Sequence, residues 1–159
     1  MMRLFLLACL FGAACGEVDD TEYPEEAGDP QLPPRGPNTL KAWIETGAYL
    51  TWNCESSGHP ARPGSPHDRN RICTNEALSN APGDGPFPVG AASVKELLDG
   101  DRIDGYAVMR KVEADSRGGD GWYWWEAFGD DVKFAAHGIG VCVDCHKDAP
   151  RDFAFTVVR

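Results

Sequence analysis

The fold is decided by two stretches of sequence, Tyr106-Ala107-Val108-Met109-Arg110-Lys111-Val112 and Trp122-Tyr123-Trp124-Trp125-Glu126-Ala127-Phe128. The first alternates roughly as a β-strand does, and the second is rich in the aromatic residues that favour strands. Turn-forming residues at 116–121 lie between them, so the two stretches are expected to form a hairpin. The aromatic and β-branched run from Asp152 to Val158 is predicted to form a third strand.

Upstream of the hairpin the sequence indicates helix as well as strand. Asn38 or Thr39 can cap a helix that is predicted to run to about Trp52. Its apolar side would carry Leu40, Trp43, Ile44 and Leu50. The segment from Val89 to Leu98 fits either a strand or a helix, because its pattern does not distinguish them. These elements together predict an α+β domain.

The N-terminus has the features of an export signal. Behind Arg3, the eleven residues from Leu4 to Ala14 are an apolar run, which is too short to span a bilayer and suits a signal peptide. Small residues directly before Cys15 resemble the lipobox of bacterial lipoproteins, although Gly12 stands where that motif prefers leucine. Residues 1–15 are therefore predicted to be a signal peptide, with Cys15 lipidated. The alternative is ordinary cleavage and release.

The segment after Cys15 has the composition of a tether. Residues 17–35 carry seven acidic residues against one basic residue, together with four prolines. Such a segment cannot bury enough apolar surface to offset the entropy of ordering. We predict a disordered tether over 16–36 and one domain over 37–159 in a periplasmic or cell-envelope protein. Its membrane contact would be the lipid anchor alone, and the absence of a basic face argues against nucleic-acid binding.

The six cysteines fall into three pairs. Cys9 and Cys15 belong to the export segment, and Cys142 and Cys145 to a motif near the C-terminus. The remaining pair, Cys54 and Cys73, is predicted to form a disulfide in an oxidising compartment, stapling the stretch 56–70. Two free thiols or an intermolecular bridge are the alternatives.

The C-terminal motif is Cys142-Val143-Asp144-Cys145-His146, and C-x-x-C-H is the attachment motif of c-type haem. Thiols two residues apart can both add to the vinyl groups of the porphyrin, and His146 would then face the iron as the proximal ligand. A redox dithiol or half of a zinc site is the alternative interpretation. A zinc site would need further ligands, for which His137, Cys54 and Cys73 are the candidates.

The position of the motif excludes the common cytochromes. Only 13 residues follow His146, whereas a small electron-transfer cytochrome carries its methionine ligand far downstream. The one methionine of the mature chain, Met109, lies upstream instead. The 18 glycines, 12 prolines and clustered tryptophans argue against a four-helix haem bundle.

Five elements in the same order resemble the cytochrome P-460 family, which includes the related cytochromes c′-beta. They are Phe87-Pro88-Val89-Gly90, Val94-Lys95-Glu96-Leu97, Gly121-Trp122-Tyr123-Trp124, Cys142-x-x-Cys145-His146-Lys147 and Asp152-Phe153-Ala154-Phe155-Thr156. The resemblance covers roughly residues 85–159, and the Cys54–Cys73 region looks like an addition. It implies a small antiparallel β-sheet domain with flanking helices, often dimeric, that carries one covalently bound, five-coordinate haem.

The resemblance also implies roles for individual residues. Cys142 and Cys145 match the thioether cysteines and His146 the proximal ligand. Lys95 matches a lysine that bonds to the porphyrin edge in the hydroxylamine-oxidising members, although an exposed lysine is the ordinary alternative. Glu113 is the nearest match to a carboxylate that accepts protons from the substrate; the alternative is a solvated glutamate at a strand end.

The distal side of the haem and the function each have more than one candidate assignment. Phe87, Phe128 and Phe134 are candidate pocket aromatics, with core packing as their ordinary role. His137 could be a sixth ligand, but a surface histidine is the preferred interpretation. The expected function is oxidation of hydroxylamine or nitric oxide, with electrons passing to a soluble redox partner. The alternatives are binding of nitric oxide without turnover, or electron transfer with His137 or Met109 as the sixth ligand.

Overall fold

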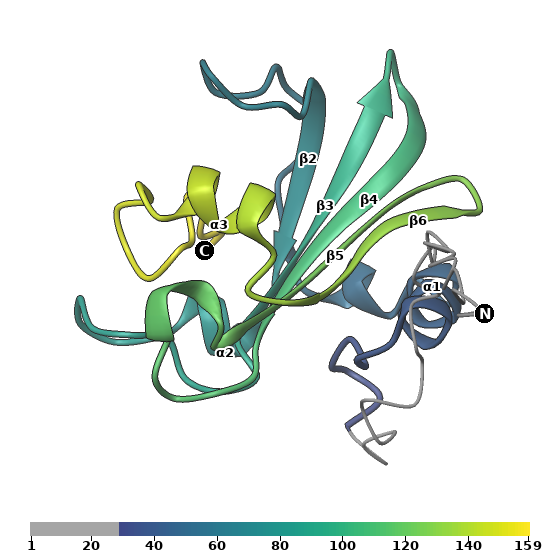
Figure 1. The fold of residues 1–159 in the computed structure, drawn as a ribbon. Coiled ribbons are helices and arrows are strands. Elements are labelled where there is room, and N and C mark those ends of the chain that lie inside the picture. Colours follow the sequence, from purple (N-terminus) through teal and green to yellow (C-terminus); the bar gives the residue numbers. More distant parts are fainter. Residues whose placement is uncertain (1–28) are drawn as a thin grey trace, which may run out of the picture.

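The computed structural model describes residues 29–159, in which six antiparallel strands form one twisted sheet (Figure 1). The strands are β1 (Asn53–Cys54), β2 (Arg69–Thr74), β3 (Ala92–Asp99), β4 (Arg102–Lys111), β5 (Trp122–Phe128) and β6 (Asp131–His137). They lie in the sheet in the order of the sequence, so each strand pairs with its neighbours in the chain. This small antiparallel sheet with a few helices confirms the predicted α+β class.

The predicted central hairpin is confirmed. β4 and β5 pair antiparallel, with Val108 opposite Trp125 and Met109 opposite Trp124. The segment left open between strand and helix is the strand β3. The sequence prediction missed β6, although Gly129-Asp130 after β5 is a two-residue turn typical of hairpins. Gly129 has φ of +53°, a left-handed conformation that glycine adopts without strain.

The two faces of the sheet are covered by different parts of the chain, as Figure 1 shows for α1 on one side and α3 on the other. Because side chains alternate along a strand, β5 contributes to both layers. Tyr123 and Trp125 pack with Leu40 and Trp43 of the helix α1 (Pro37–Glu45). On the opposite face, Trp122 and Trp124 belong to a second cluster that reaches α2 (Glu76–Ser79), α3 (Gly140–His146) and the C-terminal segment.

The predicted N-terminal helix is shorter than expected and begins earlier. α1 starts at Pro37, where a fixed φ suits the first turn and the missing N–H has no intrahelical partner to lose. Gly36, not Asn38 or Thr39, precedes the helix as its N-cap. The helix ends because Gly47 adopts a left-handed φ of +70°, and a 3₁₀ turn follows over Ala48–Thr51. Leu50 is consequently 55% exposed instead of buried on the helix face.

The predicted third strand at 152–158 was wrong. Beyond α3 the chain forms only an isolated bridge between Arg151 and Ala154. The remaining short element of the fold is a 3₁₀ turn, Arg117–Gly119, which precedes β5. Asp152 and Phe153 both have positive φ, at +39° and +67°, which breaks an extended run. The aromatic composition of this segment therefore reflects packing against the sheet.

The predicted signal peptide, the lipidated Cys15 and most of the predicted tether lie outside the described residues. The last part of the tether segment, residues 29–36, packs against the domain. Trp43 Nε1 donates to the Pro30 carbonyl at 2.8 Å, and Arg110 Nη1 donates to the Pro33 carbonyl at 2.9 Å. The described end of the predicted tether is therefore held against the domain by hydrogen bonds and is not free of it. Over 29–159, no helix has both the length and the apolar character needed to cross a membrane.

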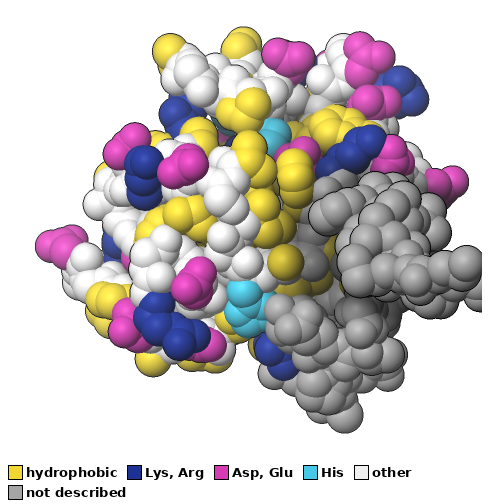
Figure 2. All heavy atoms as spheres, viewed as in Figure 1, with side chains coloured by type: hydrophobic (Ala, Val, Ile, Leu, Met, Phe, Trp, Pro, Cys, Tyr) yellow, Lys and Arg dark blue, Asp and Glu magenta, His cyan; other side chains and the backbone are white. Residues whose placement is uncertain are grey.

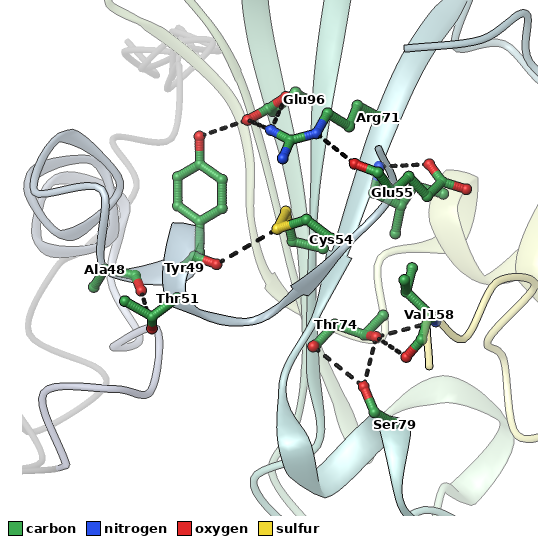
Figure 3. The surroundings of a disulfide bond; sticks show 12 residues. Ala48, Tyr49, Thr51, Cys54, Glu55, Arg71, Thr74, Ser79, Glu96 and Val158 are labelled. Carbon is green, nitrogen blue, oxygen red and sulfur yellow. Dashed lines mark hydrogen bonds and ion pairs between the residues drawn. A yellow bond between two sulfur atoms is a disulfide. The ribbon is translucent and has the colours of Figure 1, made fainter. Parts of the chain in front are cut away.

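Cys54 and Cys73 are joined in a disulfide, as predicted from the cysteine count (Figure 3). The two residues are opposite each other in the ladder between β1 and β2. Beside the disulfide, Tyr49 donates a hydrogen bond to Glu96 at 2.8 Å, and Arg71 Nη1 lies 3.2 Å from the same carboxylate. The disulfide therefore closes the irregular stretch 55–68, which we call the stapled loop, at the point where it joins the sheet.

Replacing both Cys54 and Cys73 by alanine should lower the free energy of unfolding. Closing a loop between residues 19 apart is worth about 3 kcal/mol, because the crosslink restricts the unfolded chain. Urea unfolding of wild type and variant measures the difference. Reductant should bring the wild-type midpoint down to that of the variant and leave the variant unchanged; equal midpoints without reductant would contradict the expectation.

Candidate functional site

A cavity of about 500 Å³ lies on the face of the sheet that α3 covers. This volume is within the usual range of cofactor pockets. Figure 2 shows hydrophobic side chains gathered in a band across the middle of the molecule, with charged side chains mostly toward the margins. Residues from three regions line the cavity: Lys95, Met109, Trp124, Glu126 and Phe134 of the sheet, Arg62 and His67 of the stapled loop, and Cys142, Cys145, His146 and Phe155 of the C-terminal region.

The pairing register of the strands determines which side chains of the sheet line the cavity. Lys95 is opposite Ala107, Ala107 is opposite Glu126, and Glu126 is opposite Phe134. Residues directly opposite in a ladder point to the same face, so these four side chains form one row across the cavity wall. The register shifts immediately after Glu126, where a β-bulge interrupts the pairing of β5 with β6. Bulges of this kind are common next to functional sites.

α3 brings the C-x-x-C-H motif to the same cavity. In a helix, side chains three and four residues apart share a face, so Cys142, Cys145 and His146 gather on one side. All three line the cavity, and both cysteines are free thiols. The predicted attachment and ligand residues are therefore together in the fold.

His146 is held in a single tautomer. Its Nδ1 lies 2.7 Å from the carbonyl oxygen of Phe153, and a carbonyl can only accept, so Nδ1 carries the proton and Nε2 keeps a lone pair. The ring also makes edge contacts with Trp124 and Phe155. Burial lowers the pKa of His146 to about 4, which keeps the imidazole neutral. A neutral ring oriented by a carbonyl is the usual state of a metal-binding histidine.

A buried ion pair fixes the turn that presents this carbonyl. The carboxylate of Asp152 lies 3.1 Å from Lys111 Nζ and accepts a hydrogen bond from the backbone N–H of Phe87 at 2.7 Å. Ser116 also contacts both charged groups. Lys111 is completely buried at the end of β4. The pair thus joins the sheet to the turn that carries Phe153.

Lys95 lies in the same cavity as the motif. It is on β3, in the row shared with Glu126, and most of its side chain is removed from solvent. Burial, reinforced by the charge of Arg62, lowers the pKa of Lys95. The structure therefore places Lys95 as a cavity residue, and its amine loses its proton more readily than that of an exposed lysine.

Glu113 lies away from the cavity. It follows the end of β4, forms an ion pair with Arg117, and its side chain is 42% exposed. Glu126, in the same cross-strand row as Lys95, is a carboxylate that lines the cavity, and sequence reasoning missed it. Burial raises the pKa of Glu126. Its position was readable in the strand, because alternation puts Glu126 on the same face as Trp122 and Trp124.

His67 is the second cavity residue that sequence reasoning missed. Its Nδ1 is 3.5 Å from Glu126 Oε2, and both side chains are largely buried, at 17% and 16% exposed. Burial, together with the positive charge of Lys95, lowers the pKa of His67 to about 4. No sequence pattern indicated this role, because the stapled loop has no periodicity that would assign its side chains to a face.

The remaining candidates divide between the cavity and the core. Phe128, Phe134 and Met109 line the cavity. Phe87 packs in the core against Trp122, with ring centroids 6.3 Å apart. His137 ends β6, where its Nδ1 lies 3.2 Å from the Asp120 carbonyl, and it is not among the residues that line the cavity.

The residues present fit the chemistry of c-type haem attachment. Two thiols one helical turn apart and a neutral imidazole with a free lone pair share one largely apolar cavity. Trp124 Nε1, on the cavity wall, is a buried donor for which residues 29–159 supply no acceptor. The zinc alternative lacks ligands: Cys54 and Cys73 are joined, and no three His, Cys, Asp or Glu side chains of the described region gather as a metal site.

Comparison with known proteins does not identify this chain. No protein-family model matches its sequence, and no curated protein matches it significantly. The function of the chain is therefore inferred from the geometry of the cavity and its lining residues.

Replacing Asp152 by alanine should destabilise the protein strongly. The change leaves Lys111 buried without its carboxylate, and breaking such a pair from one side costs about 3–5 kcal/mol. The matched control is Asp131→Ala, which removes an exposed partner of Lys133 and should change stability little. Urea unfolding gives the free energy of unfolding of both variants. An equal decrease in the two would show that the buried pair stabilises the protein no more than an exposed one.

Proposed function

We propose that this protein is an exported mono-haem c-type cytochrome, with haem attached through Cys142 and Cys145 and its iron bound by His146. One observation carries the proposal: the three chemically required side chains line a single cavity of cofactor size, and the ring of His146 is oriented by the Phe153 carbonyl. The free thiols support the same assignment, since cysteines already joined could not form thioether bonds.

The proposed family is that of the cytochromes P-460 and c′-beta. Two features support it beyond the order of the sequence elements. The domain is a small antiparallel sheet with helices, and Lys95 lies in the same cavity as the haem motif. The lowered pKa of Lys95 also favours a covalent bond, because the neutral amine is the nucleophilic form.

The proposed activity is oxidation of hydroxylamine or nitric oxide. Haem iron, when bound, supplies an open position for a small nitrogen ligand and accepts electrons that pass to a soluble redox partner. The chain supplies the surroundings: Trp124 and Phe134 give the cavity apolar walls, and Glu126 is a carboxylate able to accept protons. Glu126 takes the role that the sequence hypothesis gave to Glu113, because it lies in the cavity and its raised pKa makes it a better base.

The alternative within the same site is binding of nitric oxide or another diatomic gas without turnover. Phe128 and Phe134 on the cavity wall favour it, since an apolar surround suits an uncharged ligand. The buried cluster of Lys95, Glu126 and His67 favours the enzyme, because a simple gas-binding pocket needs no proton acceptors. We further propose that the domain is tethered to a bacterial cell envelope through Cys15 and that it can pair as a homodimer.

Covalent haem attachment should depend on the motif cysteines alone. Expressed with a cytochrome c maturation system, wild-type protein should keep its haem through denaturation and acid–acetone extraction. Cys142→Ala with Cys145→Ala should lose it, because no thioether bond can form. The matched control is Cys54→Ala with Cys73→Ala, which removes a different cysteine pair and should keep the haem. Retention of haem by the motif variant would refute the assignment.

Lys95 should form a third covalent link to the haem. We expect Lys95→Ala to keep the thioether-bound haem and to lose a red-shifted ferrous Soret band that wild type shows. Lys95→Arg should behave in the same way, because it keeps a positive charge but has no nucleophilic amine. Lys133→Ala, an exposed lysine on β6, is the control. Peptide mass mapping that finds Lys95 unmodified in the holoprotein would favour nitric oxide binding instead.

A further inference from the structure

We propose that His67 receives the proton of a weakly acidic ligand as that ligand enters the cavity. In this binding step Glu126, the base of the proposed oxidation, acts as a positioning residue that stabilises the resulting imidazolium. This inference rests on the proposed haem function and adds to it a proton acceptor from the stapled loop. The loop lies outside the part of the chain that resembles the cytochrome P-460 family, so His67 would be a feature of this chain.

The stapled loop is held at its base and near its tip, which fixes His67 against the cavity. At its base, the Cys54–Cys73 disulfide and a backbone pairing of His59 with Asn70 attach the loop to β2. Toward its tip, Arg62 Nη2 lies 3.1 Å from Cys145 Sγ, and the guanidinium stacks 3.5 Å above the Phe155 ring. The loop therefore closes over the cavity and contacts the haem motif directly.

The charges around His67 favour a neutral imidazole in the resting site. Lys95 on β3, His146 on α3 and Arg62 on the same loop all disfavour its protonation, in addition to burial. Glu126 on β5 is the opposing group, with Oε2 3.5 Å from Nδ1 of His67. A proton on Nδ1 is favoured by this carboxylate, which leaves the lone pair on Nε2 as the acceptor.

Proton transfer in this arrangement is balanced. A neutral ligand HX that enters the cavity gives its proton to Nε2 of His67 and remains as X⁻, and no electron moves. The imidazolium that forms then lies beside the Glu126 carboxylate, so an ion pair replaces a neutral imidazole beside a carboxylate. The carboxylate thus lowers the cost of placing a positive charge in a buried site, and His67 acts as the general base that accepts the proton.

Cyanide association with the ferric holoprotein tests the proposal, because near neutral pH cyanide arrives as HCN and must release its proton in the site. Stopped-flow absorbance at the Soret band gives the rate constant. His67→Gln should lower this rate constant by about 100-fold, the lower end of the contribution of a positioned base. The matched control is His59→Gln, since His59 is on the same loop and pairs with Glu55 at 2.9 Å outside the cavity. That variant should associate with cyanide at the wild-type rate.

Two further variants separate proton transfer from structural effects. His67→Gly should regain much of its rate when free imidazole is added, which a purely structural loss would not do. Glu126→Gln should lower the rate less than His67→Gln and shift its pH profile, whereas Glu113→Gln, away from the cavity, should leave both unchanged. The Soret spectrum of each variant reports whether the haem is retained.

Each outcome decides between the proposals. A wild-type rate in His67→Gln with haem retained would overturn the role of His67 and leave the haem assignment intact. A low-spin wild-type spectrum that becomes high-spin in His67→Gln would show that His67 binds the iron, which also overturns it. A wild-type protein without covalent haem would refute the proposed function and this inference together.

Discussion

The buried ion pair of Lys111 with Asp152 is the interaction on which the site depends. It joins the end of β4 to the turn after α3, and that turn carries the carbonyl that orients His146. Burying two charges is expensive, and an apolar pair of similar volume is often as stable. The role of this ion pair is therefore to fix positions. The Asp152 carboxylate also accepts a hydrogen bond from the backbone N–H of Phe87, so it holds together β4, the Phe87 segment and the turn after α3.

A second constraint is that both faces of the central strands are covered. Tyr123 and Trp125 pack toward α1, while Trp122 and Trp124 face α3 and the cavity. This explains the unusual run of aromatic residues, since neither side of β5 needs polar side chains for solvent. Glu126 is the exception on that strand. A carboxylate retained on a buried face beside a bulge is the pattern expected where function overrides packing.

Sequence reasoning reached the parts of the fold that depend on local pattern or on counting. The β4–β5 hairpin follows from two strand-like runs and a turn, and the Cys54–Cys73 disulfide follows from which cysteines remain unassigned. It failed where backbone conformation or distant packing decides. Positive φ at Asp152 and Phe153 turns an apparent strand into a turn that serves His146. His67 reaches the cavity only because a disulfide and the Arg62 contacts hold an irregular loop in place, and neither leaves a periodic pattern.

The two edges of the sheet differ in their exposure to intermolecular pairing. At one end of the sheet, the short strand β1 and the stapled loop together cover the outer side of β2: Ile72 exchanges hydrogen bonds with Glu55, and Asn70 pairs with His59. β6 forms the other edge, where Asp131 and Lys133 place opposite charges on exposed positions. Charged side chains on an edge strand discourage the addition of strands from another molecule. The sheet is thus protected against edge-to-edge aggregation at both ends, by a covalently anchored cover on one side and by charge on the other.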